Sequence, residues 1–149
     1  MNVVQRIEHW GDIHHAKWLD VIRIILGLLI LSKGIAFISD TDAQRDWMVQ
    51  NSAFQFSGLM AMAVVHIVAF AHLVGGILIT MGLVTRFAVV IQIPILLGAV
   101  FFVNLTKGFS PLNSELWLSV IVLMLLILFW IVGSGPYSVD HWMKYHKSR

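Results

Sequence analysis

The stretch from Ser57 to Val84 restricts the fold of this chain most strongly, because it contains no Asp, Glu, Lys or Arg. A transmembrane helix needs about 20 predominantly apolar residues, at a rise of about 1.5 Å per residue. The stretch is therefore long enough to cross a bilayer, with some tilt. Two histidines, His66 and His72, lie within it. Polar groups at membrane depth are costly and often mark a polar interior or a ligand, so these histidines are the first candidates for function.

The composition extends this interpretation to the whole chain. Of its 149 residues, 58% are hydrophobic and 12% are charged, whereas soluble domains carry about 25% charged residues. Four apolar stretches predict four membrane spans, at residues 18–39, 57–84, 87–105 and 115–132. Because the connections are short, we expect an all-α, up-down four-helix bundle, with residues 1–149 forming one integral membrane domain. The chain has no cysteine, which excludes a thiol relay, a disulfide framework and a thiolate-bound metal.

Polar segments flank the spans, and we expect short segments at the membrane surface at residues 1–17 and 141–145. Residues 40–56 are expected to form a connecting loop, in which Thr41 and Gln44 fit a capping box for a short helix with Trp47 and Met48. The basic residues outside the spans are distributed unevenly. The side of the termini and of the Thr85-Arg86 turn carries Arg6, Lys17, Arg86, Lys144, Lys147 and Arg149, and the other side carries Arg45 and Lys107. The positive-inside rule then predicts cytoplasmic N- and C-termini. The net charge of +2 is interpreted as this orientation signal and not as a nucleic-acid-binding surface.

The two histidines are predicted to have different roles. They are six residues apart, which places them about 120° apart around a helix. Chelating pairs on one helix are three or four residues apart, so we expect no metal site. His72 shares a face with Ala61, Gly76 and Ile79, which suits the centre of the bundle, while His66 lies nearer the polar segment 40–56. The alternative for either histidine is an imidazole that only forms a hydrogen bond to a backbone carbonyl.

Lys33 and Glu115 are the other candidates for binding a ligand or handling a proton. Lys33 lies inside the first span, and Glu115 is the acid at the depth where Lys33 could pair with it. The simpler alternatives are that Lys33 extends to the interface and that Glu115 stabilises a helix N-terminus.

A polar cluster is predicted at the cytoplasmic ends of the helices. Asp20 and Arg23 are i,i+3 neighbours, and Arg86 and Asp140 are expected at a similar depth. Such an ion-paired network would fix the helix ends. Alternatively, the two arginines would form an anion or lipid-headgroup site.

These features together resemble the DoxX/DoxD family of small four-span bacterial membrane proteins. The resemblance rests on Arg23-Ile24-Ile25-Leu26-Gly27 with Lys33-Gly34, His72-Leu73-Val74-Gly75-Gly76, Gly82-Leu83-Val84-Thr85-Arg86, Glu115-Leu116 and Gly133-Ser134-Gly135-Pro136-Tyr137-Ser138-Val139-Asp140. It implies a location in the bacterial inner membrane. It also implies a link to redox chemistry, because DoxD proteins belong to a thiosulfate:quinone oxidoreductase and some DoxX proteins associate with redox enzymes.

Three functions fit these residues, and no catalytic residues are assigned. The first is a quinone-interacting or accessory membrane subunit of an oxidoreductase complex, with no covalently bound cofactor and with a redox protein as partner. The second is a non-catalytic scaffold or assembly partner. The third is a small-molecule or proton transporter, which would require a homo-oligomer because four helices enclose little space.

Overall fold

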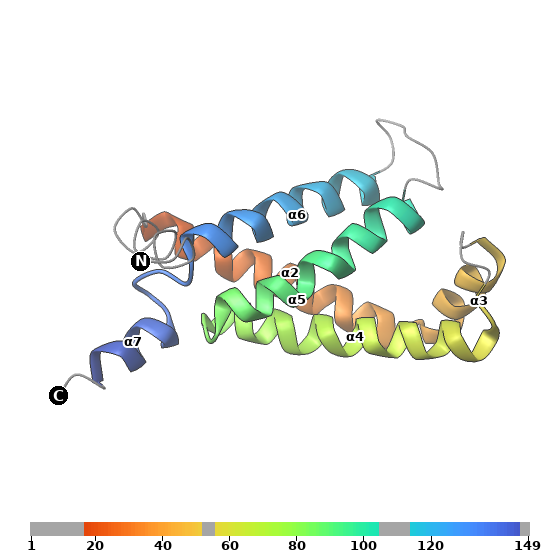
Figure 1. The fold of residues 1–149 in the computed structure, drawn as a ribbon, viewed down its shortest axis with the longest axis horizontal. Coiled ribbons are helices and arrows are strands. Elements are labelled where there is room, and N and C mark those ends of the chain that lie inside the picture. The colour runs from red at the N-terminus through yellow and green to blue at the C-terminus, as the bar shows by residue number, and fades with distance from the viewer. Residues whose placement is uncertain (1–16, 52–55, 105–113, 147–149) are drawn as a thin grey trace, which may run out of the picture.

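The computed structural model describes residues 17–51, 56–104 and 114–146, and every regular element in these ranges is a helix (Figure 1). In chain order they are α2 (Lys17–Ser39), α3 (Thr41–Asn51), α4 (Gly58–Met81), α5 (Thr85–Gly98), the π-helix η1 (Ala99–Asn104), α6 (Ser114–Val132) and α7 (Val139–His146). The prediction of an all-α membrane bundle with short flanking helices is confirmed. Most of the predicted interfacial segment at residues 1–17, and Lys107, Lys147 and Arg149, lie outside the described residues.

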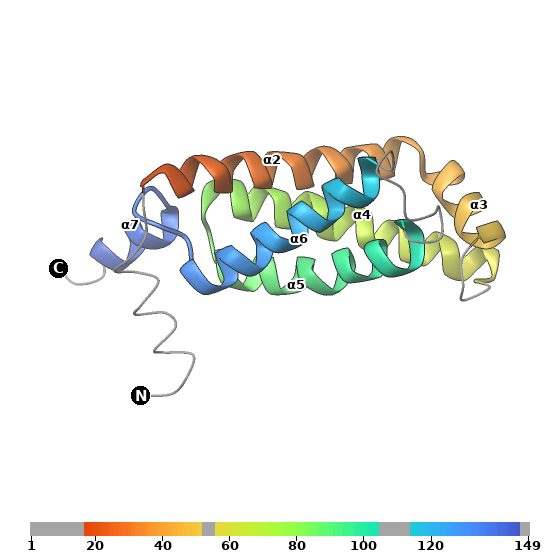
Figure 2. The same ribbon diagram turned by 90° about the horizontal axis from the view of Figure 1, so that it is seen from above.

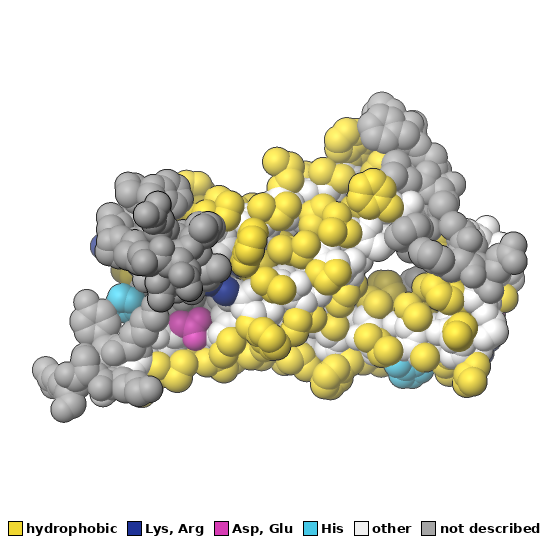
Figure 3. Space-filling view, in the orientation of Figure 1, with side chains coloured by type: hydrophobic (Ala, Val, Ile, Leu, Met, Phe, Trp, Pro, Cys, Tyr) yellow, Lys and Arg dark blue, Asp and Glu magenta, His cyan; other side chains and the backbone are white. Residues whose placement is uncertain are grey.

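Helices α2, α4 and α6 are each long and apolar enough to cross a membrane, and α5 is a shorter apolar helix that η1 continues. Large hydrophobic side chains point outward along all of them, for example Leu28, Phe70 and Met124. Figure 3 shows hydrophobic side chains over the middle of the bundle, with the visible acidic and basic side chains at the end next to α7. The chain is a multi-pass membrane protein whose outer surface contacts lipid.

The four spans form two closely packed antiparallel pairs, α2 with α4 and α5 with α6 (Figure 2). The pairs approach each other near the α4–α5 turn. Toward the other end, where α3 lies, α5 and α6 diverge from α2 and α4 in the view of Figure 1. The bundle is therefore tighter at its α7 end than at its α3 end.

Glycines allow the backbones of α2 and α4 to touch. A Cβ atom on Gly76 would lie 2.6 Å from the backbone nitrogen of Leu31, and one on Gly34 would lie 2.8 Å from that of Leu73. A Cβ on Gly27 would lie 2.6 Å from the backbone nitrogen of Thr80. Small residues at such contacts drive helix association in a membrane, where lipid is as apolar as the side chains. These three contacts fix the register of the antiparallel pair.

The register also locates the apolar band of the bundle. Extending it from Gly34 and Leu73 places Thr41 at the level of His66, and Arg23 at the level of Val84. The path from Asp20 to Thr41 rises about 30 Å at about 1.5 Å per residue, which is the thickness of a hydrocarbon core. In this register His66 is level with the end of α2, and Asp20 and Arg23 are near the level of the α4–α5 turn.

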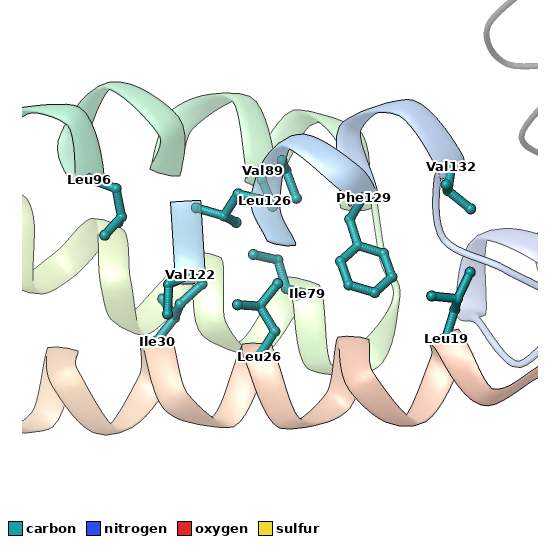
Figure 4. Packing of buried hydrophobic residues seen from close by; sticks show 11 residues of the cluster. Leu19, Leu26, Ile30, Ile79, Val89, Leu96, Val122, Leu126, Phe129 and Val132 are labelled. Atoms are coloured by element: carbon teal, nitrogen blue, oxygen red, sulfur yellow. The ribbon is translucent and has the colours of Figure 1, made fainter. Parts of the chain in front are cut away.

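The hydrophobic core lies in the α7 half of the bundle (Figure 4). Leu26, Ile79, Leu126 and Phe129 are fully buried and come from three different helices. Leu96, Val122 and Ile30 are the labelled core residues toward the α3 end. Helix α3, which confirms the predicted helix in the polar segment, packs against α4 at that end.

We predict that Gly76→Val separates α2 from α4, because its side chain would overlap the backbone of Leu31. Overpacking of this kind costs about 1–3 kcal/mol or more, measured as the free energy of unfolding in detergent micelles. Gly98→Val is the matched control, since a Cβ on Gly98 would have no atom within 4 Å. Equal stability of the two variants would contradict this account of the packing.

Candidate functional site

Polar side chains gather at two places, and the first is the α7 end of the bundle. Arg23 is fully buried there, and its Nη2 donates to the backbone carbonyl of Tyr137 at 2.9 Å and lies 3.4 Å from Asp20 Oδ1. Asp20 Oδ2 accepts a hydrogen bond from the Tyr137 backbone N–H at 3.3 Å. The Asp20–Arg23 pair thus holds both backbone polar groups of Tyr137, and so attaches the chain after α6 to α2.

Asp140 joins the same end to the α4–α5 turn. Its carboxylate accepts hydrogen bonds from the backbone N–H groups of Val84, at 2.8 Å, and Thr85, at 3.2 Å, at the start of α5. The Asp140 N–H donates to the Gly82 carbonyl at 3.1 Å, and the carboxylate lies within electrostatic range of Arg23. A negative charge at a helix N-terminus is favourable, so Asp140 stabilises α5 while it anchors α7. We call Asp20, Arg23 and Asp140 the end cluster.

Arg86 lies beside the exit of α6. Its Nη2 donates to the Ile131 carbonyl at 3.3 Å, and its guanidinium packs against Gly133, whose φ is +85°. Of the four residues predicted at this end, Asp20 and Arg23 thus pair and bond to the backbone of Tyr137, while Asp140 bonds to the α4–α5 turn. Arg86, in α5, reaches the end of α6 with its side chain. Ser138 accepts from the His141 N–H at 3.1 Å and caps α7.

Val84 is held in an unfavourable backbone conformation, with φ of 47° and ψ of 40°. This left-handed region costs L-residues roughly 1–2 kcal/mol, and β-branched residues rarely occupy it. We predict that Val84→Gly raises the free energy of unfolding by about 1 kcal/mol, because glycine adopts this conformation readily. Val90→Gly, within regular α5, is the control and should lower stability by about 0.5 kcal/mol. A lower free energy of unfolding for Val84→Gly would show that the backbone of Val84 is not strained.

We predict that Asp140→Ala lowers the free energy of unfolding by about 1–2 kcal/mol, because two N–H groups at the start of α5 lose their acceptor. Asp42→Ala is the control: Asp42 is 81% exposed at its side chain and pairs with Arg45 on α3, so its loss should cost less than about 1 kcal/mol. Chemical denaturation of both variants beside the wild type measures the difference. Similar values for the two would mean that Asp140 does not anchor the turn.

The second polar place lies inside the apolar band and centres on His72. The His72 side chain is only 7% exposed and shares its face with buried Ala61, Gly76 and Ile79. Its Nδ1 lies 3.0 Å from the Val68 carbonyl oxygen, and its ring stacks on Phe37 at 6.0 Å between centroids. His72 lies six residues, or about 9 Å at about 1.5 Å per residue, along α4 from His66, in the direction of the α4–α5 turn.

The hydrogen bond to Val68 determines which nitrogen of neutral His72 carries the proton. A carbonyl oxygen can only accept, so Nδ1 carries the hydrogen and Nε2 keeps a lone pair. Within the described part of the chain, Nε2 has no hydrogen-bond partner. His72 therefore presents a hydrogen-bond acceptor, and a site for a proton, in the membrane interior.

Gln92 on α5 lies beside the same segment of α4. It is fully buried, and its Nε2 donates to the Ala71 carbonyl at 2.6 Å and packs against Gly75. Its Oε1 is buried and has no partner among the described residues. Ala71 directly precedes His72 in α4. Gly75 lies about 60° around the helix from His72. The amide of Gln92 and the ring of His72 thus bond to carbonyls of Ala71 and Val68, which are three residues, or about 4.5 Å, apart along α4.

Lys33 also lies at this depth, next to Gly34, the residue on which His72 packs. Its side chain is exposed, and its charge is within electrostatic range of His72. The described residues show no ion pair between Lys33 and Glu115, which is exposed in the first turn of α6. We call His72, Gln92, Phe37 and Lys33 the inner site.

His66 does not belong to the inner site. It is exposed, lies about 9 Å along α4 from His72 at about 1.5 Å per residue, and its Nδ1 bonds to the Met62 carbonyl at 2.8 Å. Among the residues that the structure describes, no three His, Asp or Glu side chains are grouped so that they could hold a metal ion.

Sequence reasoning missed two members of the inner site, Gln92 and Phe37. Gln92 could have been found as an amide in the middle of an apolar span, because such a group must find a partner on a neighbouring helix. Phe37 carries no signal of its own. Its role depends on the register of α2 against α4.

The fold and these two polar places define a multi-pass α-helical membrane protein with a polar group inside its bilayer-spanning part. Residues 18–105 match the DoxX family, and the match covers more than half of the chain. The chain belongs to the DoxX family, which confirms the resemblance seen in its sequence. No curated protein and no solved structure matches the chain.

Proposed function

We propose that this protein is a quinone-interacting accessory subunit of a membrane oxidoreductase complex, and that the inner site holds the quinone head. The observation that carries the proposal is His72, a buried imidazole in the apolar band with Nε2 directed to no partner in the described chain. A quinone head needs an apolar slot with a few polar groups, and a group that exchanges protons near neutral pH.

The residues present fit such a head. Phe37 provides an aromatic face beside the imidazole, and Gln92 provides a second buried polar atom beside the same segment of α4. Lys33 adds an ammonium that can donate hydrogen bonds. A bound quinone would supply electron and proton exchange within the membrane, and His72 would hold or release the proton at Nε2.

We place the end cluster on the cytoplasmic side of a bacterial inner membrane, since most of the basic residues outside the spans lie there. The chain has no cysteine, so the electrons would come from or go to a separate redox protein. That protein is the partner we propose.

The test measures quinone binding to the purified protein in lipid nanodiscs. We expect a short-chain ubiquinone to bind to the wild type, and His72→Ala to weaken binding about tenfold, which is the loss of one buried hydrogen bond. His66→Ala is the matched control and should bind normally, because His66 is exposed and lies about 9 Å along α4 from His72. An organic extract of the wild-type protein should also contain quinone from the membrane.

Failure to extract quinone, together with no binding on titration, would overturn the proposal. A stoichiometric partner from native membranes that binds His72→Ala as well as the wild type, with full function of that variant, would favour the scaffold instead. Size-exclusion chromatography of each variant shows whether a loss of binding reflects the site or the fold.

A further inference from the structure

We propose that the inner site prefers the reduced, hydroxyl-bearing form of the quinone to the oxidised form. This inference rests on the proposed function. It follows from which hydrogen-bonding atoms remain on the two buried side chains, His72 and Gln92, after each has bonded to the backbone of α4.

His72 has an acceptor left. Its Nδ1–H is used by the Val68 carbonyl at 3.0 Å, and a carbonyl oxygen offers no hydrogen in return. The neutral ring therefore presents the bare Nε2 lone pair. To present Nε2–H instead, the neutral ring would have to move its hydrogen from Nδ1, which would set two lone pairs against each other at Val68.

Gln92 also has an acceptor left. Its Nε2 donates to the Ala71 carbonyl at 2.6 Å, and rotating the amide by half a turn would place Oε1 against that carbonyl oxygen. The orientation is therefore determined by chemistry, and Oε1 is the atom without a partner among the described residues. A buried polar atom in that state is destabilising, and a ligand hydroxyl would supply its missing hydrogen bond.

Two acceptors, on side chains held by α4 carbonyls that are three residues apart, match a hydroquinone and not a quinone. A hydroquinone carries two O–H donors, whereas the two carbonyl oxygens of a quinone are acceptors. A site built to bond a hydroxyl discriminates strongly against an analogue that lacks its hydrogen, because the buried partner is then left unpaired. Lys33 is the donor that would favour the quinone, but its side chain is exposed and its ammonium can contact water.

This preference has a consequence for redox chemistry. Tighter binding of the reduced form raises the reduction potential of the bound couple. For a two-electron couple, a tenfold preference corresponds to about 30 mV. The protein would then hold reducing equivalents in the membrane next to its redox partner.

The experiment compares decylubiquinol with decylubiquinone, titrated anaerobically by calorimetry into the full-length protein in nanodiscs. We expect the quinol to bind at least about tenfold more tightly, the effect of one satisfied buried acceptor. Gln92→Met and His72→Phe keep the side-chain bulk and remove one acceptor each, so each should weaken quinol binding about tenfold and leave quinone binding nearly unchanged. His66→Ala should preserve the preference.

Equal affinities, or tighter binding of the quinone, would overturn this inference and leave the proposed function standing. Binding of neither form would overturn the proposed function as well. If a substitution prevents folding, the wild-type comparison of the two redox forms alone decides the preference. A preference that persists in both Gln92→Met and His72→Phe would show that these acceptors do not produce it.

Discussion

The structure depends on the backbone contact between α2 and α4. In a bilayer, burial of apolar surface does not favour one helix pairing over another, so close packing of small residues determines which helices associate and in what register. Gly76 meets the backbone of Leu31, and Gly34 meets that of Leu73. A shift of this register by one turn, about 5.4 Å, would separate Arg23 from Gly82 and His72 from Gly34. Both polar places are therefore consequences of one contact.

The end cluster contains a buried charge pair whose desolvation is offset by hydrogen bonds to the backbone. Removing one partner of such a pair typically costs about 3–5 kcal/mol, while the intact pair contributes little net stability. Here Arg23 and Asp20 hold the backbone of Tyr137, and Asp140 holds that of Val84 and Thr85. The pair thereby connects segments that are more than 100 residues apart. The strain at Val84 persists because the carboxylate of Asp140 bonds to that residue's N–H.

Patterns within one helix made part of this structure predictable. Apolar stretches located the spans, the 3.6-residue period placed His72 on the inner face, and i,i+3 spacing paired Asp20 with Arg23. Contacts between helices were not accessible in the same way. Lys33 and Glu115 were matched by depth alone, but pairing also requires that the two helices turn the right faces toward each other. Gln92 was overlooked because its partner, the Ala71 carbonyl, is a backbone group that no sequence pattern marks.

The inner site bears on the choice between a ligand-binding subunit and a scaffold. A bundle that served only to assemble other proteins would be more stable with apolar residues at positions 72 and 92. Instead, Gln92 is fully buried and uses one half of its amide, and His72 uses one of its two nitrogens. Each bond to α4 leaves an acceptor, and the burial of the Gln92 Oε1 without a partner among the described residues costs free energy within the isolated chain. A ligand with hydroxyl groups offsets that cost in the bound state, whereas a partner protein at the membrane surface would not contact either atom.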